Sequence, residues 1–350
     1  HTHLDLTFLE GRLASAAPFT DWVRELVAIR RVTPVETLAD GIARGVARLL
    51  ATGTTAVGDI CGAGLSARRL REGGLGGVVY HEVLGYRPAM REEALASLTA
   101  RVESAPACER LRMGVSPHAV YSTSPGLMAD AVAFARRFAL PTAIHLVETV
   151  EEEQFTLTGT GPFAALIADL TGAPPLAHPE KRPAEVAQAS GVLTGGLVIH
   201  GNHLSDDDIE TVARERASVV WCPGSNLWFG RTPTHPVRGL RRAGVAVGLG
   251  TDSLASNDDL DMAREVRLAA DAEGLPLTEA FRLATEEGGR ALGMPPDSGT
   301  LRIGAPFDAV AVADPDPRDQ TATLWNDIMA PDRIVRGVFI NGALRFESGT

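Results

Sequence analysis

The most regular feature of the chain is a series of short apolar runs, each followed by a longer stretch with apolar residues at helical spacing. The runs are rich in small and β-branched residues and lack polar alternation, which is typical of strands buried on both faces. The expected strands are residues 54–60, 77–81, 111–115, 142–146, 197–200, 218–222 and 245–249.

Amphipathic segments lie between these runs, and the expected helices are residues 33–51, 91–104, 125–138, 205–214, 260–270 and 278–292. This alternation predicts an α/β fold, a (β/α)8 TIM-like barrel over residues 1–295. Only seven strands are visible, whereas a closed barrel of this type has about eight. Because the chain begins in a polar, histidine-rich segment, we expect strand one to lie upstream of residue 1.

The remaining residues, 296–350, have a different character. Residues 299–312 and 334–346 are strand-like, and Asn341-Gly342 interrupts the second run. This dipeptide between apolar runs predicts a hairpin. We therefore expect the C-terminal part of a small β-sandwich subdomain here, with the N-terminal part of the sandwich upstream of residue 1.

Composition narrows the class of protein. The chain has 350 residues, 45% of them hydrophobic, and a formal net charge of −11, so it can bury a large core and repels phosphate backbones. Nucleic acid is therefore excluded as an expected partner. Three cysteines without a CxxC motif (Cys61, Cys108 and Cys222) argue against a disulfide framework and favour a reducing cytoplasm. No apolar run is long enough to predict a membrane span.

Four residues have the chemistry of metal ligands. His1 and His3 are two apart on an extended segment and point to the same side. His145 and Asp252 each end a predicted strand, at the level where barrel enzymes place catalytic groups. Each residue alone has an ordinary structural explanation, but their common level in one fold favours a metal site. Three imidazoles, one carboxylate and an open position are typical of a catalytic site rather than a closed structural one.

Two further residues at that level can handle protons. His200 ends the next predicted strand, and Glu148 lies three residues after His145. We expect His200 and Asp252 to orient the attacking water and take its proton, while Glu148 supplies a proton to the substrate. The neighbouring run 151–153 of three glutamates is interpreted as a solvated helix start instead, because acidic residues suit a first helical turn.

The ordered motifs resemble those of the amidohydrolase superfamily, in its adenosine-, guanine- and chlorotriazine-hydrolase branch. The motifs are HTHLDLTFLEG, VSPHAVYSTSP, HLVET, IHGNHL, VVWCPGSNLWFG and GTDSLASNDDLDM, and they cover essentially the whole chain. The resemblance implies the same four ligands (His1, His3, His145 and Asp252) and acid/base roles for Glu148 and His200. It also implies that His118 faces the substrate and that Asn226 lies near the mouth of the barrel, where it can contact substrate. A homodimer is a further expectation from the resemblance.

The resemblance also bears on the number of ions. Its binuclear members bridge two ions through a lysine after strand four, and the only lysine here is Lys181, in a polar loop. We therefore expect one divalent ion, with zinc as first choice and iron or manganese as alternatives. His178-Pro179-Glu180 matches an HxE zinc motif but lacks PCxxC, and is interpreted as loop.

The substrate follows less directly from the sequence. In nucleoside-deaminating relatives the loops after strands one and seven surround the sugar, and here they carry Trp22, Trp228 and Arg231. These side chains favour an adenine-type nucleoside; the candidates are 6-amino-6-deoxyfutalosine, adenosine and S-adenosylhomocysteine. The alternatives are a deaminase of guanine or another free base, a triazine chlorohydrolase, and a non-catalytic metal-binding protein on the same scaffold.

Overall fold

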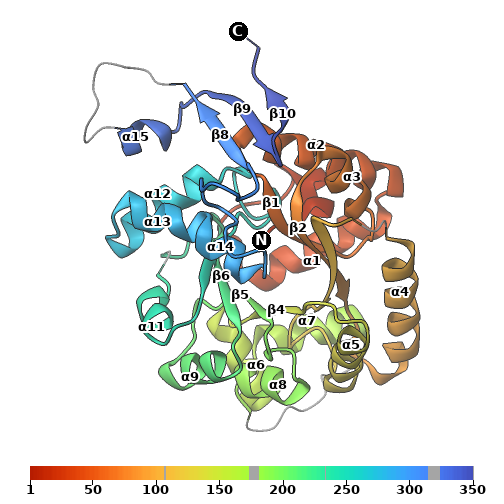
Figure 1. Ribbon diagram of the computed structural model, residues 1–350. Coiled ribbons are helices and arrows are strands. Elements are labelled where there is room, and N and C mark those ends of the chain that lie inside the picture. Colours follow the sequence, from red (N-terminus) through yellow and green to blue (C-terminus); the bar gives the residue numbers. More distant parts are fainter. Residues whose placement is uncertain (106–107, 173–180, 233, 314–323, 350) are drawn as a thin grey trace.

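The computed structural model describes residues 1–105, 108–172, 181–232, 234–313 and 324–349, and its main body is a barrel of parallel strands surrounded by helices (Figure 1). One parallel sheet has the order β1-β2-β3 and a second has the order β4-β5-β6-β7. The strands are β1 (Ala56–Cys61), β2 (Gly76–Val83), β3 (Leu111–Pro117), β4 (Ala143–Leu146), β5 (Leu197–His200), β6 (Ser218–Trp221) and β7 (Val247–Leu249). The parallel barrel is thereby confirmed.

Isolated parallel bridges close the two sheets into a ring. Val115 of β3 pairs with Thr142 just before β4. On the opposite side Thr2 pairs with both Asp59 of β1 and Asp252 after β7. The segment from His1 to His3 therefore occupies the strand position between β1 and β7, at the carboxyl ends of those strands.

A compact apolar cluster fills the inside of the barrel. It comprises Ile60, Val78, Tyr80, Ala143, Leu197, Ile199, Val220 and Cys222, and each is almost completely buried. These side chains come from alternate positions of five strands, while the positions between them pack against the outer helices. The next inward-facing position beyond this cluster, toward the carboxyl ends, therefore lies at the mouth of the barrel.

The helices outnumber those predicted. They are η1 (Leu4–Leu9), α1 (Phe19–Val32), α2 (Val35–Thr52), α3 (Ser66–Gly73), η2 (Pro88–Met90), α4 (Arg91–Ser104), α5 (Pro125–Arg137), α6 (Val150–Thr158), α7 (Pro162–Thr171), α8 (Pro183–Ser190), α9 (Asp206–Arg214), α10 (Pro223–Trp228), α11 (Val237–Arg242), α12 (Met262–Glu273), α13 (Leu277–Ala284), α14 (Glu286–Ala291) and α15 (Leu324–Ile328). Local signals fix several starts: the Ser124 hydroxyl accepts the Leu127 amide at α5, and Ser205 with Asp208 forms a capping box at α9.

One predicted helix, residues 278–292, is wrong as a single element. The backbone of Thr285 leaves the helical region at φ −121° and ψ −93°, which separates α13 from α14.

None of the described helices is long and apolar enough to cross a membrane.

A three-stranded antiparallel sheet beside the barrel forms the C-terminal region (Figure 1). Its order is β10-β9-β8, with β8 (Ala309–Val312), β9 (Val335–Ile340) and β10 (Ala343–Glu347). Asn341 and Gly342 both have positive φ, 51° and 77°, and connect β9 to β10, so the predicted hairpin is confirmed. Strand formation within 299–312 is limited to β8. Val335, Val338 and Ile340 pack into the apolar cluster between α2 and the outer face of the barrel strands.

Candidate metal centre

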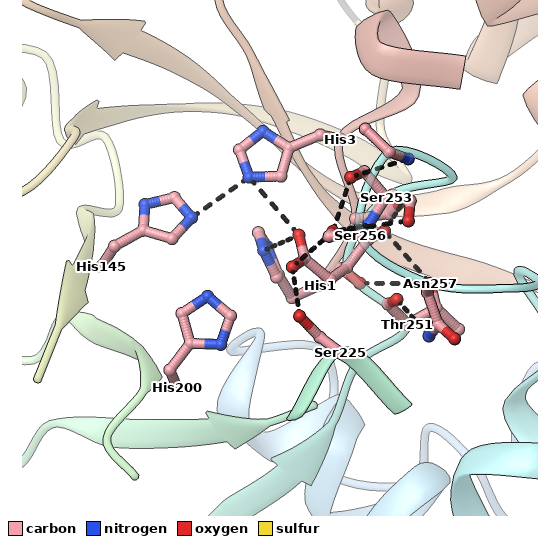
Figure 2. A network of polar contacts seen from close by, with 12 residues as sticks. His1, His3, His145, His200, Ser225, Thr251, Ser253, Ser256 and Asn257 are labelled. Carbon is pink, nitrogen blue, oxygen red and sulfur yellow. Dashed lines mark hydrogen bonds and ion pairs between the residues drawn. The ribbon is translucent and has the colours of Figure 1, made fainter. Parts of the chain in front are cut away.

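Three histidines predicted as ligands meet at the mouth of the barrel (Figure 2). One ring nitrogen from each of His1, His3 and His145 lies within 4.8 Å of the others. The Nε2 atoms of His3 and His145 are 3.1 Å apart. Asp252 Oδ1 lies 3.5 Å from His1 Nε2 and 3.8 Å from His3 Nε2. The structure therefore brings together all four residues predicted as ligands.

These separations suit a single ion. Tetrahedral zinc with bonds of about 2.0–2.1 Å places neighbouring ligand atoms about 3.4 Å apart, close to the distances found here. Both ring nitrogens of His1 are buried, and neither has a hydrogen-bond partner among the described residues. Burial also lowers the pKa of His3 and of His145, so both imidazoles are neutral and keep lone pairs for a cation. The donor set fits a divalent metal with three nitrogens and one oxygen.

Backbone pairing of Thr2 sets the positions of the two N-terminal ligands. Its amide donates to Gly58, its carbonyl accepts from the Ile60 amide, and its hydroxyl donates to the Asp252 carbonyl at 2.8 Å. Because Thr2 lies in the ring of strands, its neighbours His1 and His3 point together to the inside.

Asp252 is held in an uncommon backbone conformation. Its φ is +57°, a left-handed value that few non-glycine residues adopt. The hydroxyls of Ser225 and Ser256 donate to its Oδ2 at 2.9 Å and 2.8 Å, and Oδ1 is left to face His1 and His3. The two serines thus orient the carboxylate, as outer-shell groups commonly do at metal sites.

His145 is oriented by the loop after β3. Its Nδ1 lies 3.2 Å from the His118 carbonyl, so Nδ1–H donates there and Nε2 is free for the ion. The His118 ring itself stands 4.8 Å from the His145 ring, measured between centroids, which places this predicted substrate contact beside the ligands. Its Nδ1 is 2.6 Å from the Ser122 hydroxyl.

The predicted acid/base pair lies next to the ligands: the His200 ring centroid is 5.5 Å from that of His145 and 5.9 Å from that of His1. His200 Nε2 is 3.6 Å from Glu148 Oε2, and Arg231 Nη1 is 3.6 Å from Glu148 Oε1. Burial raises the pKa of Glu148 to about 8, against the opposing charge of Arg231. Burial lowers the pKa of His200 to about 4. At neutral pH the pair is therefore a protonated carboxyl group beside a neutral imidazole.

A buried carboxylate and two amides support the Glu148 loop. Glu152 Oε2 accepts the Glu148 amide at 3.3 Å, and Glu152 is only 1% exposed. The expectation that residues 151–153 form a solvated helix start is therefore wrong for Glu152, although all three lie in the first turn of α6. Asn202 donates to the Glu148 carbonyl, and its side chain pairs reciprocally with Asn226. This pairing gives Asn226 a positioning contact; its predicted contact with substrate stays a prediction.

An aromatic cluster forms one wall of the mouth. The Trp22 indole is buried, donates to the Ala255 carbonyl at 2.9 Å, and packs edge-on against Phe229. The Arg231 guanidinium lies over the Phe229 and Phe19 rings, 4.7 Å and 5.4 Å from their centroids. Trp228 is half-buried and lines a hollow of about 250 Å³ together with Leu254 and Asp258. Substrate contacts of Trp22, Trp228 and Arg231 stay predictions.

The structure also shows a mouth residue that the sequence did not reveal. Glu82, near the end of β2, has its Oε1 3.9 Å from His118 Nε2. The only hint in the sequence was a carboxylate inside the apolar run GVVYHEV. Lys181 is exposed, far from β3 in the chain, and the end of β3 carries Ser116 and Pro117 instead. His178-Pro179-Glu180 lies outside the described residues.

Comparison with known proteins agrees with this architecture. Residues 1–345 match the family model described as the amidohydrolase family. The chain belongs to this family. It is a hydrolytic enzyme that acts on carbon–nitrogen bonds, as the deaminases among its relatives do.

Two curated relatives and one solved structure illustrate the similarity. An aminodeoxyfutalosine deaminase of Deinococcus radiodurans is 32% identical over 312 residues, which cover 84% of this chain and 71% of that protein. A 5-methylthioadenosine/S-adenosylhomocysteine deaminase of Halobacterium salinarum is 33% identical over 338 residues, with coverages of 89% and 70%. An adenosine deaminase from Xanthomonas campestris, crystallised with bound zinc, superimposes with a TM-score of 0.80 at 25% identity, covering 98% of this chain and 78% of the other.

Proposed function

We propose that this amidohydrolase deaminates an adenine-type nucleoside, replacing the ring amino group by oxygen and releasing ammonia. The observation that carries the proposal is the position of the Glu148 carboxyl group, which lies 3.6 Å from His200 Nε2, while the His200 ring stands next to His1 and His145 of the predicted ligand cluster. Aromatic deamination needs a proton donor in the ring plane for a ring nitrogen and an activated water above the face of the neighbouring carbon. The names of the two curated relatives and of the zinc-containing structure support the adenine base as the reacting group.

The four ligands would hold one divalent ion, and zinc is the first choice because the similar adenosine deaminase contains it. When bound, such an ion makes hydroxide available at neutral pH. Iron or manganese would fit the same donor set.

The residues of the chain provide the proton transfers. Asp252 and His200 orient the attacking water, and one of them accepts its proton. Glu148 donates its proton to the ring nitrogen next to the attacked carbon, which lets the ring accept the electron pair. The proton taken from water then passes to the amino group, which leaves as ammonia, and the remaining hydroxyl proton returns to Glu148 as the product carbonyl forms. Burial favours the protonated form of Glu148 and the neutral form of His200, as these roles require.

The aromatic wall indicates which 5′ substituent of the sugar the site could accommodate. Arg231 is 25% exposed and stacked on Phe229, so it offers a cation and a flat surface beside Glu148. A nucleoside with an aromatic or carboxylate-bearing 5′ group, such as 6-amino-6-deoxyfutalosine, would suit this surface. Adenosine and S-adenosylhomocysteine are the other candidates.

We propose the same domain division as the sequence predicted, with the barrel over residues 1–295 and a small subdomain over residues 296–350. The antiparallel sheet of β8, β9 and β10 supports this division, and we interpret it as part of a β-sandwich.

The test is ammonia release from adenosine, S-adenosylhomocysteine and aminodeoxyfutalosine by the metal-loaded protein. Guanine, adenine and a chlorotriazine form the comparison set. Turnover of at least one nucleoside in preference to the free bases is expected. Preference for a free base or triazine would select the corresponding alternative, and inactivity on all six compounds would overturn the proposal.

A further inference from the structure

His200 points into the mouth against the alternation of its own strand. Along β5 the side chains of Leu197 and Ile199 face the barrel interior, whereas Val198 faces the outer helices. Regular alternation would turn His200 outward, in line with Leu146, its partner in the register of β4 and β5. Its ring nevertheless stands beside the rings of the predicted ligands (Figure 2). A local departure from strand geometry therefore brings His200 to the site.

That departure is a left-handed backbone conformation at His200. Its φ is +68°, a value that few residues other than glycine adopt. Such a conformation persists in other residues only where the surrounding structure holds it. The ladder between β5 and β6 ends at Ile199 and Val220, so on that side the sheet pairing does not extend to His200. The left-handed turn therefore needs support from a contact outside this ladder.

The His235 side chain supplies such a contact. Its Nε2 lies 2.9 Å from the His200 carbonyl oxygen, and because a carbonyl only accepts, Nε2 carries the proton and donates it. His235 is 6% exposed, and burial lowers its pKa to about 4, so the ring is neutral at pH 7. Its other nitrogen, Nδ1, is buried and has no hydrogen-bond partner within the described part of the chain. The one hydrogen bond of the ring is therefore directed at the residue with the left-handed backbone.

Neighbouring residues fix the His235 ring in this position. Pro236 follows it directly at the start of α11, and a residue before proline is confined mainly to extended backbone. Val237 and Leu240 of α11 are completely buried in the same outer apolar cluster as Trp221. The His235 and Trp221 rings are stacked, with centroids 5.0 Å apart and planes inclined by 16°. The ring has little freedom to turn, so its donor stays aimed at one acceptor.

We propose that His235 is a positioning residue that keeps His200 turned into the mouth. Its Nε2–H group holds the His200 carbonyl from the outer side of the strands, where Trp221 packs. The His200 ring is then left directed inward, with its Nε2 3.6 Å from Glu148 Oε2. This inference rests on the proposed role of His200 in the deamination. Because His235 acts through His200 and not on the substrate, its loss should lower kcat more than it raises KM.

The experiment compares three replacements of His235 in the metal-loaded protein, with the best nucleoside of the activity screen as substrate. His235→Gln places an amide nitrogen as many bonds from the backbone as Nε2, so it can donate to the His200 carbonyl. His235→Met has a similar length without a donor, and His235→Phe keeps a ring that can stack on Trp221. In His235→Met and His235→Phe, kcat should fall about 10- to 100-fold, whereas in His235→Gln it should fall less than about threefold. KM and bound metal should stay within about threefold of the wild-type values in all three variants.

Nuclear magnetic resonance of isotope-labelled histidine tests the hydrogen bond in the wild-type protein. His235 should show a protonated Nε2 whose proton exchanges slowly with water, and the disappearance of this signal in His235→Gln assigns it. Protonation of Nδ1 instead of Nε2 would overturn the inference. This measurement does not depend on the folding of the donor-free variants.

His203→Phe is the matched control, because His203 is an exposed histidine in the loop after β5, and it should keep the wild-type kcat. Thermal unfolding of each variant separates positioning from a purely structural role. A lower Tm with unchanged kcat in His235→Met and His235→Phe would show that His235 only satisfies a buried carbonyl. That result would overturn the inference and leave the proposed deamination intact.

An equal loss of kcat in His235→Gln and in the two donor-free variants would also overturn the inference, because the donor would then not matter. If the wild-type protein turns over no nucleoside, the proposed function fails. The role of His200, on which this inference rests, then fails with it.

Discussion

Two neighbouring parts of the mouth are built in different ways: the predicted ligand set of His1, His3, His145 and Asp252 (the ligand side), and Glu148 with His200 (the proton-transfer side). On the ligand side, the Asp252 carboxylate accepts hydroxyl hydrogen bonds of 2.9 Å and 2.8 Å. The contacts of Thr2 fix its sequence neighbours, His1 and His3. On the proton-transfer side, both contacts of the Glu148 carboxyl group, to His200 and to Arg231, are 3.6 Å long. The ligand side is thus organised before anything binds, whereas Glu148 keeps its hydrogen-bonding capacity for the substrate. Catalytic hydrogen bonds often shorten only in the substrate complex.

The most damaging change should be loss of the ligand side itself. His3→Ala removes one of three imidazoles and leaves Asp252 facing a buried gap, so bound metal and turnover should both fall below detection. Metal analysis of the purified variant and an ammonia assay check this. Full activity without bound metal would refute the ligand assignment. His203→Ala serves as control, because His203 is exposed and lies outside the cluster.

Glu148→Gln should abolish proton transfer to the substrate without affecting metal binding. The amide keeps the shape of the side chain but cannot donate the acidic proton, so kcat should fall by about 10²- to 10⁴-fold. Metal content should stay at the wild-type level, because Glu148 is not among the ligands. Parallel measurement of kcat and bound metal tests both statements, and persistent activity would show that the acid assignment is wrong.

The serine pair offers a milder way to loosen the ligand side. Ser225→Ala combined with Ser256→Ala removes both hydroxyl donors from Asp252 Oδ2 and should weaken metal affinity by about 10- to 100-fold. Activity should recover at saturating metal, which distinguishes this effect from loss of a proton-transfer group. Metal titration with an activity readout measures it. Ser190→Ala, in α8, should leave the titration unchanged.

The smallest expected effect concerns pH. The proposed mechanism uses the protonated form of Glu148, whose pKa burial raises to about 8, so kcat/KM should decline as pH rises through that value. Arg231 stabilises the ionised form and so lowers this pKa. Arg231→Met should therefore move the alkaline limb to higher pH, by about one unit or less. Arg231→Lys keeps the charge and should leave the limb nearer the wild-type position. A downward shift in Arg231→Met would contradict the assignment.

The sequence predicted that the residues of these two sides lie close together, but it did not predict the contacts that support Glu148, for a physical reason. Strands and their ends are marked by local apolar runs, so the level shared by His145, His200 and Asp252 could be inferred. The supports of Glu148 depend on long-range packing. Nothing local indicates that Glu152 folds under the Glu148 amide, or that Asn226 pairs with Asn202 from another loop.

Helix α1 and the position of Glu82 could not be predicted from the sequence for related reasons. Helix α1 carries no local start signal such as a hydroxyl cap, since Pro18 precedes it without a side-chain hydrogen bond. Glu82 is a single carboxylate within an apolar run, and its place at the mouth becomes visible only when β2 brings it near His118. A lone polar residue near a strand's carboxyl end is therefore a useful signal in barrels of this kind.

The position of Thr2 between β1 and β7 has a consequence for the mechanics of the whole chain. Its hydroxyl bonds the Asp252 carbonyl across 250 positions of sequence, and the predicted ion would join the same two segments through His3 and Asp252. In polymer terms such an ion is a cross-link that ties most of the chain into one ring. Closing a ring of this size removes on the order of 5 kcal/mol of entropy from the unfolded chain. The ion would thus stabilise the closed barrel as well as supply its reactive centre.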